Sequence, residues 1–207
     1  MTLYFKTTKP INDVTSDSMK KLILIPALLL LTAFAGKAQT KYEVDASHSS
    51  IVFTLPYHFT PFSGSFGVFN GEAMLTDKKD FASAAVKFQV DISSIDTHSP
   101  DRDKYMGSSD WLNYNEFQHA SFESTSITKN DDGTFSMMGN LTAGGITKEI
   151  ETQVTLVGQG KGRNNAQVMG LVCEFQMVRS DFKLGRSGGK IGDKVDFKMG
   201  LQLIQAK

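Results

Sequence analysis

Apolar and polar residues alternate along eight separate stretches of this chain, and this repeated period of two constrains the fold more than any other feature. Successive side chains of a β-strand point to opposite faces, so alternation is typical of a strand with one buried and one solvated face. We therefore predict an all-β protein. The predicted strands are residues 42–55, 66–75, 86–92, 120–127, 135–141, 150–156, 169–177 and 195–203.

The connections between these stretches favour a barrel over a sandwich. Residues 130–133 (Asn-Asp-Asp-Gly) predict a tight hairpin, and residues 158–165 predict a loop. Antiparallel neighbours joined by short turns can close on themselves, which removes the exposed edges that invite aggregation. We predict an eight-stranded antiparallel β-barrel, which is just wide enough to be filled by side chains or to hold one small ligand.

One segment between the third and fourth predicted strands interrupts the pattern. Ser99 precedes Pro100, and acidic residues follow at Asp101 and Asp103, which together predict a short helix. A second short turn is expected near Ser109. This helical insertion is predicted to cover one mouth of the barrel.

Residues 19–38 have the three parts of a secretory signal peptide: a basic start, the apolar run Leu22–Phe34, and the small-residue end Ala35–Ala38. A retained membrane anchor is the alternative, but the run is shorter than the roughly 20 apolar residues needed and contains Pro26. We expect cleavage after Ala38, export to the periplasm or medium, and no permanent membrane anchor. Residues 1–18 are expected to be a mis-called leader, and residues 39–207 to form one domain.

Composition excludes some function classes for the expected mature chain. Residues 39–207 hold 17 Lys and Arg against 20 Asp and Glu, a net charge of −3 without basic clusters. We therefore expect no nucleic-acid partner. Cys173 is the only cysteine and cannot form an internal disulfide. Because apolar residues flank it at every second position, a buried, inert thiol is favoured over a reactive one.

The sequence offers no convincing catalytic or metal site. The histidines lack metal-ligand spacing, so no metal is expected at His48, His58, His98 or His119. Residues 185–189 match the Gly-x-Ser-x-Gly pattern of a nucleophile elbow, which requires a strand before it and a helix after it. The flanking residues predict a flexible loop instead. Four charged residues are candidates for a structural ion-pair network or for orienting a head group: Arg102, Asp103, Arg179 and Asp181.

Residues 42–53 (Tyr-Glu-Val-Asp-Ala-Ser-His-Ser-Ser-Ile-Val-Phe) resemble the opening of the YceI-like, polyisoprenoid-binding, lipocalin-like exported proteins. Further elements agree in the family's order, and the resemblance spans essentially all of residues 39–207. It implies an extended lipocalin-like barrel that holds an amphiphile with a long hydrocarbon tail, such as a polyisoprenoid or an isoprenoid quinone. The further elements are His58 and residues 64–66, 92–97, 102–103, 120–124, 139–142, 145–148 and 179–182.

Phenylalanine and methionine are the residues expected to line such a barrel. Residues 39–207 hold thirteen of the fifteen phenylalanines and seven of the nine methionines. Phenylalanine gives large apolar walls and methionine adapts to irregular ligands, although the same side chains would also fill a packed core. The candidate lining residues are Phe53, Leu55, His58, Phe66, Met74, Phe88, Val90, Trp111, Leu112, Phe122, Met137, Leu141, Leu156, Met169, Phe175, Phe182, Phe197 and Met199.

The function that these observations favour is that of a non-enzymatic, exported lipid-binding protein for transport, storage or stress protection. No cofactor is expected other than a bound polyisoprenoid or isoprenoid quinone. Two alternatives stay open: an enzyme acting on a barrel-bound lipid, and a structural or stress-response protein with a filled barrel. The resemblance is compatible with a homodimer, and the sequence leaves the oligomeric state open.

Overall fold

The computed structural model describes residues 39–186 and 188–207. The expected leader and signal peptide, residues 1–38, lie outside the described residues, so both remain predictions. Across the described ranges, no helix has the length and apolar character needed to span a membrane.

Most of the described chain is β-strand, with one short α-helix and several single-turn 3-10 helices. The α-helix is α1 (Pro100–Met106). The 3-10 turns are η1 (Ala46–His48), η2 (Phe81–Ser83), η3 (Ile92–Ser94), η4 (Arg163–Asn165) and η5 (Arg179–Phe182). The strands are β1 (Thr40–Val44), β2 (Ser50–Tyr57), β3 (Thr60–Phe66), β4 (Phe69–Leu75), β5 (Ala84–Asp91), β6 (Ile95–Asp96), β7 (His119–Lys129), β8 (Phe135–Ala143), β9 (Ile146–Lys161), β10 (Gln167–Val178) and β11 (Lys194–Gln205).

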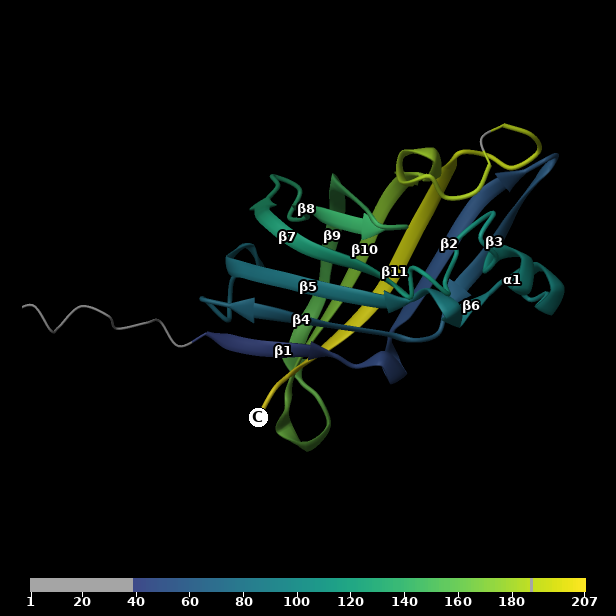
Figure 1. Cartoon of the computed structure of the whole chain (residues 1–207). Coiled ribbons are helices and arrows are strands. Elements are labelled where there is room, and N and C mark those ends of the chain that lie inside the picture. Colours follow the sequence, from purple (N-terminus) through teal and green to yellow (C-terminus); the bar gives the residue numbers. More distant parts are fainter. Residues whose placement is uncertain (1–38, 187) are drawn as a thin grey trace, which may run out of the picture. The chain divides into compact units, whose positions relative to one another are not determined.

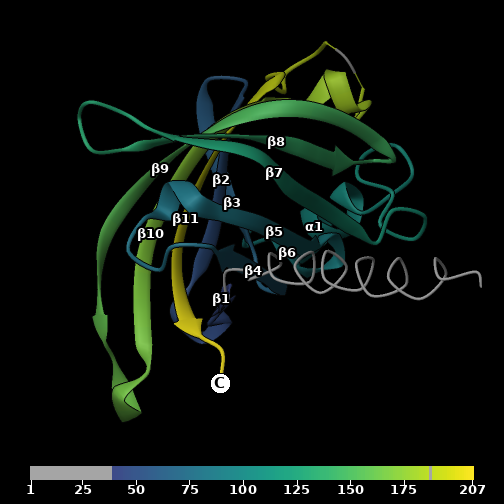
Figure 2. The same cartoon turned by 90° about the vertical axis from the view of Figure 1, so that its left-hand side faces the viewer.

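Eight of these strands close into an antiparallel barrel, as the alternation predicts (Figures 1 and 2). Their order is β1-β4-β5-β7-β8-β9-β10-β11, and β1 pairs with β11 to complete the ring. The short α1 lies between β6 and β7, so the helical insertion is also confirmed. Pro100 stands in its first turn, but the Ser99 side chain makes no capping hydrogen bond.

Three of the barrel strands are kinked, which the sequence pattern did not show. β1 and β2 together follow β11, and residues 45–49 break what was predicted as a single strand over 42–55. β4 is likewise continued by β3, a strand that the prediction of 66–75 omitted except for Phe66. β5 is continued by β6, which pairs with β3.

Aspartate-based turns produce two of these kinks. Asp45 Oδ1 accepts hydrogen bonds from the Ser47 backbone nitrogen at 3.1 Å and from Ser47 Oγ at 2.6 Å. Asp91 Oδ1 accepts the same two bonds from Ser93, at 2.8 and 2.6 Å. A side-chain oxygen that accepts from the second following residue closes a local turn and competes with the strand ladder. The strand therefore changes direction at each Asp-x-Ser.

The kinks open the barrel on one side, and the helical insertion lies there. β7 pairs with β5 as far as His119–Asp91, so β6 has no strand partner on the β7 side. The chain from α1 to residue 118 occupies this side (Figure 1). Met106 and Trp111 from this segment are buried and pack with the barrel residue Phe53. The insertion thus covers the opening with its own apolar side chains.

Two further boundaries differ from the prediction. β7 is eleven residues long, with a register shift between Ser124 and Ser126, although its polar sequence indicated a weaker strand. β9 runs to Lys161, so the loop expected from Gly158 begins later. Its last residues pair with β10 from Gly158 onward. The alternation could not show this because Gly158, Gln159 and Gly160 carry no apolar side chain.

The buried residues form two clusters, one toward each end of the barrel. The first cluster includes Tyr42, Leu75, Phe135 and Met169. The second includes the covering residues Met106 and Trp111 with their neighbours on the kinked strands. Phe122 packs against both clusters, which places it near the middle of the barrel.

Candidate functional site

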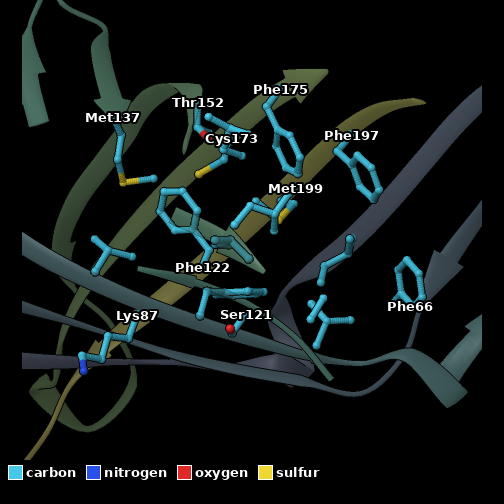
Figure 3. A pocket seen from close by; sticks show the side chains of 18 of the residues that line it. Phe66, Lys87, Ser121, Phe122, Met137, Thr152, Cys173, Phe175, Phe197 and Met199 are labelled. Atoms are coloured by element: carbon cyan, nitrogen blue, oxygen red, sulfur yellow. The ribbon is translucent and has the colours of Figure 1, made fainter. Parts of the chain in front are cut away.

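A cavity of about 150 Å³ lies inside the barrel between the two clusters. The surface that its walls present is apolar throughout. Figure 3 shows aromatic rings and sulfur-bearing side chains converging on it from opposite walls. An apolar cavity of this size stays dry and holds a molecule of roughly benzene size. The barrel is therefore not packed solid.

A row of aromatic rings forms one wall of the cavity. Phe175 on β10 lies directly opposite Phe197 on β11, and both rings line the main cavity. Phe197 in turn lies opposite Phe53 on β2, which borders only the neighbouring second cavity. The rings of Phe175 and Phe197 are stacked, with centroids 4.8 Å apart and planes at 4° (Figure 3). Cross-strand aromatic pairs of this kind stabilise a sheet beyond their buried area. The same contacts give the cavity a flat apolar side.

Inward-facing glycines lie under the ring of Phe53 and under two further phenylalanine rings. A Cβ at Gly64 would lie 2.5 Å from Phe53 Cζ, and a Cβ at Gly71 would lie 2.5 Å from Phe88 Cδ2. At Gly139 the nearest atom would be Phe122 Cζ, at 2.3 Å. These distances are too short for any side chain. Each glycine therefore lets a phenylalanine ring lie close to the barrel wall.

A second cavity, of about 50 Å³, lies beneath the covering segment. It shares Phe66, Leu112 and Phe197 with the main cavity, so the two are neighbours. Trp111 also lines it, and among the described residues the Trp111 Nε1 is the buried side-chain nitrogen or oxygen without a hydrogen-bond partner. An unpaired buried donor costs about 1–3 kcal/mol. The surface that this cavity presents is apolar throughout, so the indole nitrogen lies behind its wall rather than open to it.

The Arg179 side chain organises the wall of this second cavity. The residue is 3% exposed, and its guanidinium donates from Nε to the Gly192 carbonyl at 2.9 Å and from Nη1 to the Leu184 carbonyl at 2.9 Å. Nη1 and Nη2 donate to two further carbonyls, and the group lies 5.3 Å from the centre of the Trp111 ring. Asp193 is the nearby acid, at 3.9 Å from Nε. Arg179 thus fastens the chain between η5 and β11.

The four charged candidates do not meet in one site. Arg102 Nε donates to Thr97 Oγ1 at 2.8 Å, and Asp103 Oδ1 accepts from the Thr97 backbone nitrogen at 2.8 Å. These bonds fasten α1 to the end of β6. Asp181 instead forms an exposed ion pair with Lys148 at 3.3 Å. The head-group role proposed for all four together therefore has no common location, whereas Arg179 alone reaches a cavity.

Cys173 lines the main cavity from β10 and is 2% exposed. Burial raises the pKa of its thiol to about 12, because the apolar surroundings disfavour the thiolate. The burial expected from the sequence is therefore confirmed. Because the thiolate is the reactive form, the raised pKa agrees with an inert thiol.

The structure distributes the eighteen candidate lining residues over three locations. Their role in ligand binding stays a prediction, but their positions are clear. Ten line the main cavity: Phe66, Phe88, Val90, Leu112, Phe122, Met137, Leu141, Phe175, Phe197 and Met199. Three line only the second cavity: Phe53, Leu55 and Trp111. Five line neither: His58, Met74, Leu156, Met169 and Phe182.

Physical reasons separate these last five from the cavities. His58 lies exposed in the turn between β2 and β3. Met74 is on the face of β4 opposite to buried Ala73 and Leu75. Met169 and Phe182 are buried within the core clusters, and Leu156 is partly buried against one.

Several lining residues were not among the sequence candidates. Leu171, Cys173 and Leu201 share an inward face with residues that were chosen, so the period of two already indicated them. Phe81 and Leu184 lie outside the strands, in η2 and after η5. No periodicity marks such positions.

No group of three or more His, Cys, Asp or Glu residues in the described ranges is arranged to hold a metal ion. Gly185 lies in a loop after η5, and no helix follows it before β11 among the described residues, so this region lacks the strand-elbow-helix of a nucleophile elbow. Ser187 itself lies outside them.

Comparison with known proteins places these features in a family. The YceI-like domain matches residues 42–203. A UPF0312 protein from Yersinia pestis is 30% identical over 182 residues, which cover 87% of this chain and 94% of the relative. A UPF0312 protein from Yersinia enterocolitica is 28% identical over 186 residues, covering 89% and 96%.

Solved structures agree on the fold. BcnA from Burkholderia cenocepacia has a TM-score of 0.70 at 20% identity and covers 77% of this chain and 98% of its own. A polyisoprenoid-binding domain from Saccharophagus degradans, implicated in plant cell wall breakdown, has a TM-score of 0.61 at 13% identity, covering 80% and 98%. At these identities the likeness establishes the barrel architecture.

Proposed function

Because the chain belongs to the YceI-like family, we propose that its barrel binds a long-chain isoprenoid, an isoprenoid quinone or a similar amphiphile and carries it unchanged. The observation that carries this proposal is the apolar cavity between the two core clusters. Export to the periplasm or medium, and a role in transport, storage or stress protection, belong to the same proposal. A solved neighbour in this fold is a polyisoprenoid-binding domain, which supports the ligand class.

The walls favour a flexible hydrocarbon tail. Each buried methylene contributes about 0.8 kcal/mol, so a tail of isoprene units can bind tightly through apolar contact alone. The space of about 150 Å³ accepts only a short part of such a tail. A longer part requires side chains to move, and Met137 and Met199 in the wall are unbranched and adaptable.

We propose that a polar end of the same ligand reaches Trp111, whose indole N–H would have to become exposed by movement of the side chains that line the apolar second cavity. The unpaired Trp111 Nε1 lies at this end of the interior, next to the guanidinium of Arg179. A hydroxyl, carbonyl or quinone oxygen would supply the acceptor that the indole lacks. An amphiphile with its tail in the main cavity and an oxygen near Trp111 fits both observations.

Two leucine substitutions on β10 test whether the ligand lies inside the barrel. Cys173→Leu adds bulk to the cavity wall, whereas Val172→Leu adds it to the neighbouring residue of opposite orientation. We expect Cys173→Leu to weaken binding of geranylgeraniol by about tenfold, since overfilling an interior costs about 1–3 kcal/mol. Binding is followed by the fluorescence of Trp111, the only tryptophan in the chain.

The experiment also requires a control variant and a check that both variants fold. Val172→Leu should bind as the wild type does, and both variants should keep the wild-type circular dichroism spectrum. Equal binding by all three proteins would place the ligand outside the barrel. Chemical conversion of the recovered isoprenoid would contradict carriage and favour an enzyme.

A further inference from the structure

We infer that the turn between β2 and β3, with the lysines beside it, is a surface that binds an anionic lipid membrane. The turn carries two exposed aromatic residues. Phe59 is 91% exposed and Tyr57 is 44% exposed. Pro56 and Pro61, one on each strand, are also exposed. The tip of this hairpin therefore exposes aromatic and proline side chains beside the polar His58 and Thr60.

The chemistry of the turn is unusual for a hairpin selected only for stability. Tyr57 pairs with Thr60, which leaves His58 and Phe59 as a two-residue turn. His58 has a φ of +54°, in the left-handed region where glycine or asparagine is ordinarily found. A residue in the left-handed conformation thus precedes a phenylalanine that is almost fully exposed. Such departures from local rules are concentrated at functional positions.

The second component is positive charge next to this tip. The His58 backbone nitrogen donates to the Lys190 carbonyl at 2.6 Å, and the Gly192 nitrogen donates to the Pro56 carbonyl at 2.7 Å. These bonds hold Lys190 alongside the turn, and Lys194 begins β11 soon after. Both lysine side chains are exposed.

The segment beside the turn carries a modest local excess of positive charge, although it contains no basic run. Residues 183–194 hold four Lys and Arg and one acid, Asp193, a net charge of +3, although residues 39–207 carry −3 in total. Arg186 forms an ion pair with Asp110 at 3.0 Å, and Asp193 lies 3.9 Å from Arg179 Nε. Among the described residues, the three lysines of this segment, Lys183, Lys190 and Lys194, form no ion pair and carry its remaining positive charge. Exposed aromatic residues combined with cations are typical of protein surfaces at an anionic membrane interface.

The position of the turn relates this membrane-binding surface to the cavities inside the barrel. In Figures 1 and 2 the β2–β3 turn lies at one end of the described barrel and the β9–β10 turn at the other. The segment that holds Lys190 also supplies Leu184 to the wall of the second cavity, next to Trp111. Contact through Phe59 would bring this end of the barrel to the membrane from which a lipid is taken. Uptake of a lipid from the membrane rests on the proposed function, whereas the membrane contact itself does not.

Vesicle co-flotation tests the contact directly. The full-length chain is expressed, and the protein is purified in whatever form the cell leaves after any cleavage. Mass spectrometry then identifies its N-terminus. Phosphatidylcholine vesicles are compared with and without phosphatidylglycerol. We expect the wild type to float with the anionic vesicles, and Phe59→Ser to weaken partitioning by about tenfold because it removes a large apolar side chain. Lys190→Gln should weaken it by about fivefold at low salt.

The matched control is Val157→Ser, which removes another exposed apolar side chain, 68% exposed, on β9. Its partitioning should equal that of the wild type, and all variants share the wild-type N-terminus. Equal flotation of the wild type, Phe59→Ser and Val157→Ser would overturn the inference. So would a Phe59-dependent self-association in solution without vesicle binding, which would identify a second copy as the partner.

Geranylgeraniol binding separates the two proposals. Phe59→Ser should bind it as the wild type does, since Phe59 lines neither cavity. Vesicle binding without geranylgeraniol binding would leave the membrane surface standing and contradict lipid carriage. Geranylgeraniol binding without vesicle binding would leave lipid carriage standing and contradict the membrane surface.

Discussion

Glycine residues determine how much room the phenylalanine rings leave inside the barrel. Gly64, Gly71 and Gly139 face inward, and a phenylalanine ring fills the place that a side chain would take at each. A ring that lies against the wall uses little of the lumen. The open interior therefore depends on which inward positions lack a Cβ, as well as on the large residues themselves.

A pair of alanine substitutions tests this account. At Gly139 a Cβ would lie 2.3 Å from Phe122 Cζ and 2.6 Å from the Glu123 carbonyl oxygen, whereas at Gly158 it would meet no atom within 4 Å. We expect Gly139→Ala to lower the free energy of unfolding by about 1–3 kcal/mol. Gly158→Ala should change it by no more than about 0.5 kcal/mol. Urea unfolding measures both, and equal values for the two variants would count against the account.

The elements show where the sequence was informative and where it was not. Period-two alternation predicted the inward faces of β5, β8, β10 and β11, because side-chain direction in a strand follows from spacing alone. It did not locate the kinks, because apolar residues recur on both sides of them. The sequence Asp-x-Ser occurs at both kinks, in residues 45–47 and 91–93. Only the structure shows that each aspartate accepts a hydrogen bond from the serine and so closes a turn.

The turn at Asp45 predicts a pH dependence. Hydrogen bonds from Ser47 and then from His48 hold the pKa of the Asp45 carboxyl at about 2, below its ordinary 3.8. Since the folded-state pKa is the lower one, the ionised carboxylate stabilises the fold fully above about pH 4. This contribution is lost as the pH falls through 2.

Asp45→Asn should therefore reduce the loss of stability between pH 5 and pH 2. The reduction should be partial, because Asp45 is one of several carboxyls that contribute to this loss. Urea midpoints of the wild type and the variant at several pH values measure the difference. The pKa values of Asp91, Asp132 and Asp193 are also lowered by their own hydrogen bonds, so part of the acid sensitivity should remain. Parallel curves for the two proteins would contradict the role given to Asp45.

At the scale of the whole molecule, the barrel could be predicted from the strand count and the resemblance, but the site could be predicted only in part. The alternation of inward and outward side chains along a strand identified wall residues such as Phe175 and Phe197, because this alternation depends only on local spacing. It could not distinguish a wall residue from a core residue such as Met169, because both face inward. That distinction depends on how far the strands diverge, which is set by the kinks and by the covering segment around Trp111.

The central claim is that the barrel holds a long-tailed lipid, and native mass spectrometry tests it most directly. The protein is recovered without detergent from its exported form, and any bound material is then extracted and identified. We predict a one-to-one adduct whose mass is that of an isoprenoid or isoprenoid quinone and which is lost on unfolding. A mass equal to that of the chain alone, unchanged after incubation with geranylgeraniol or quinones, would contradict the claim.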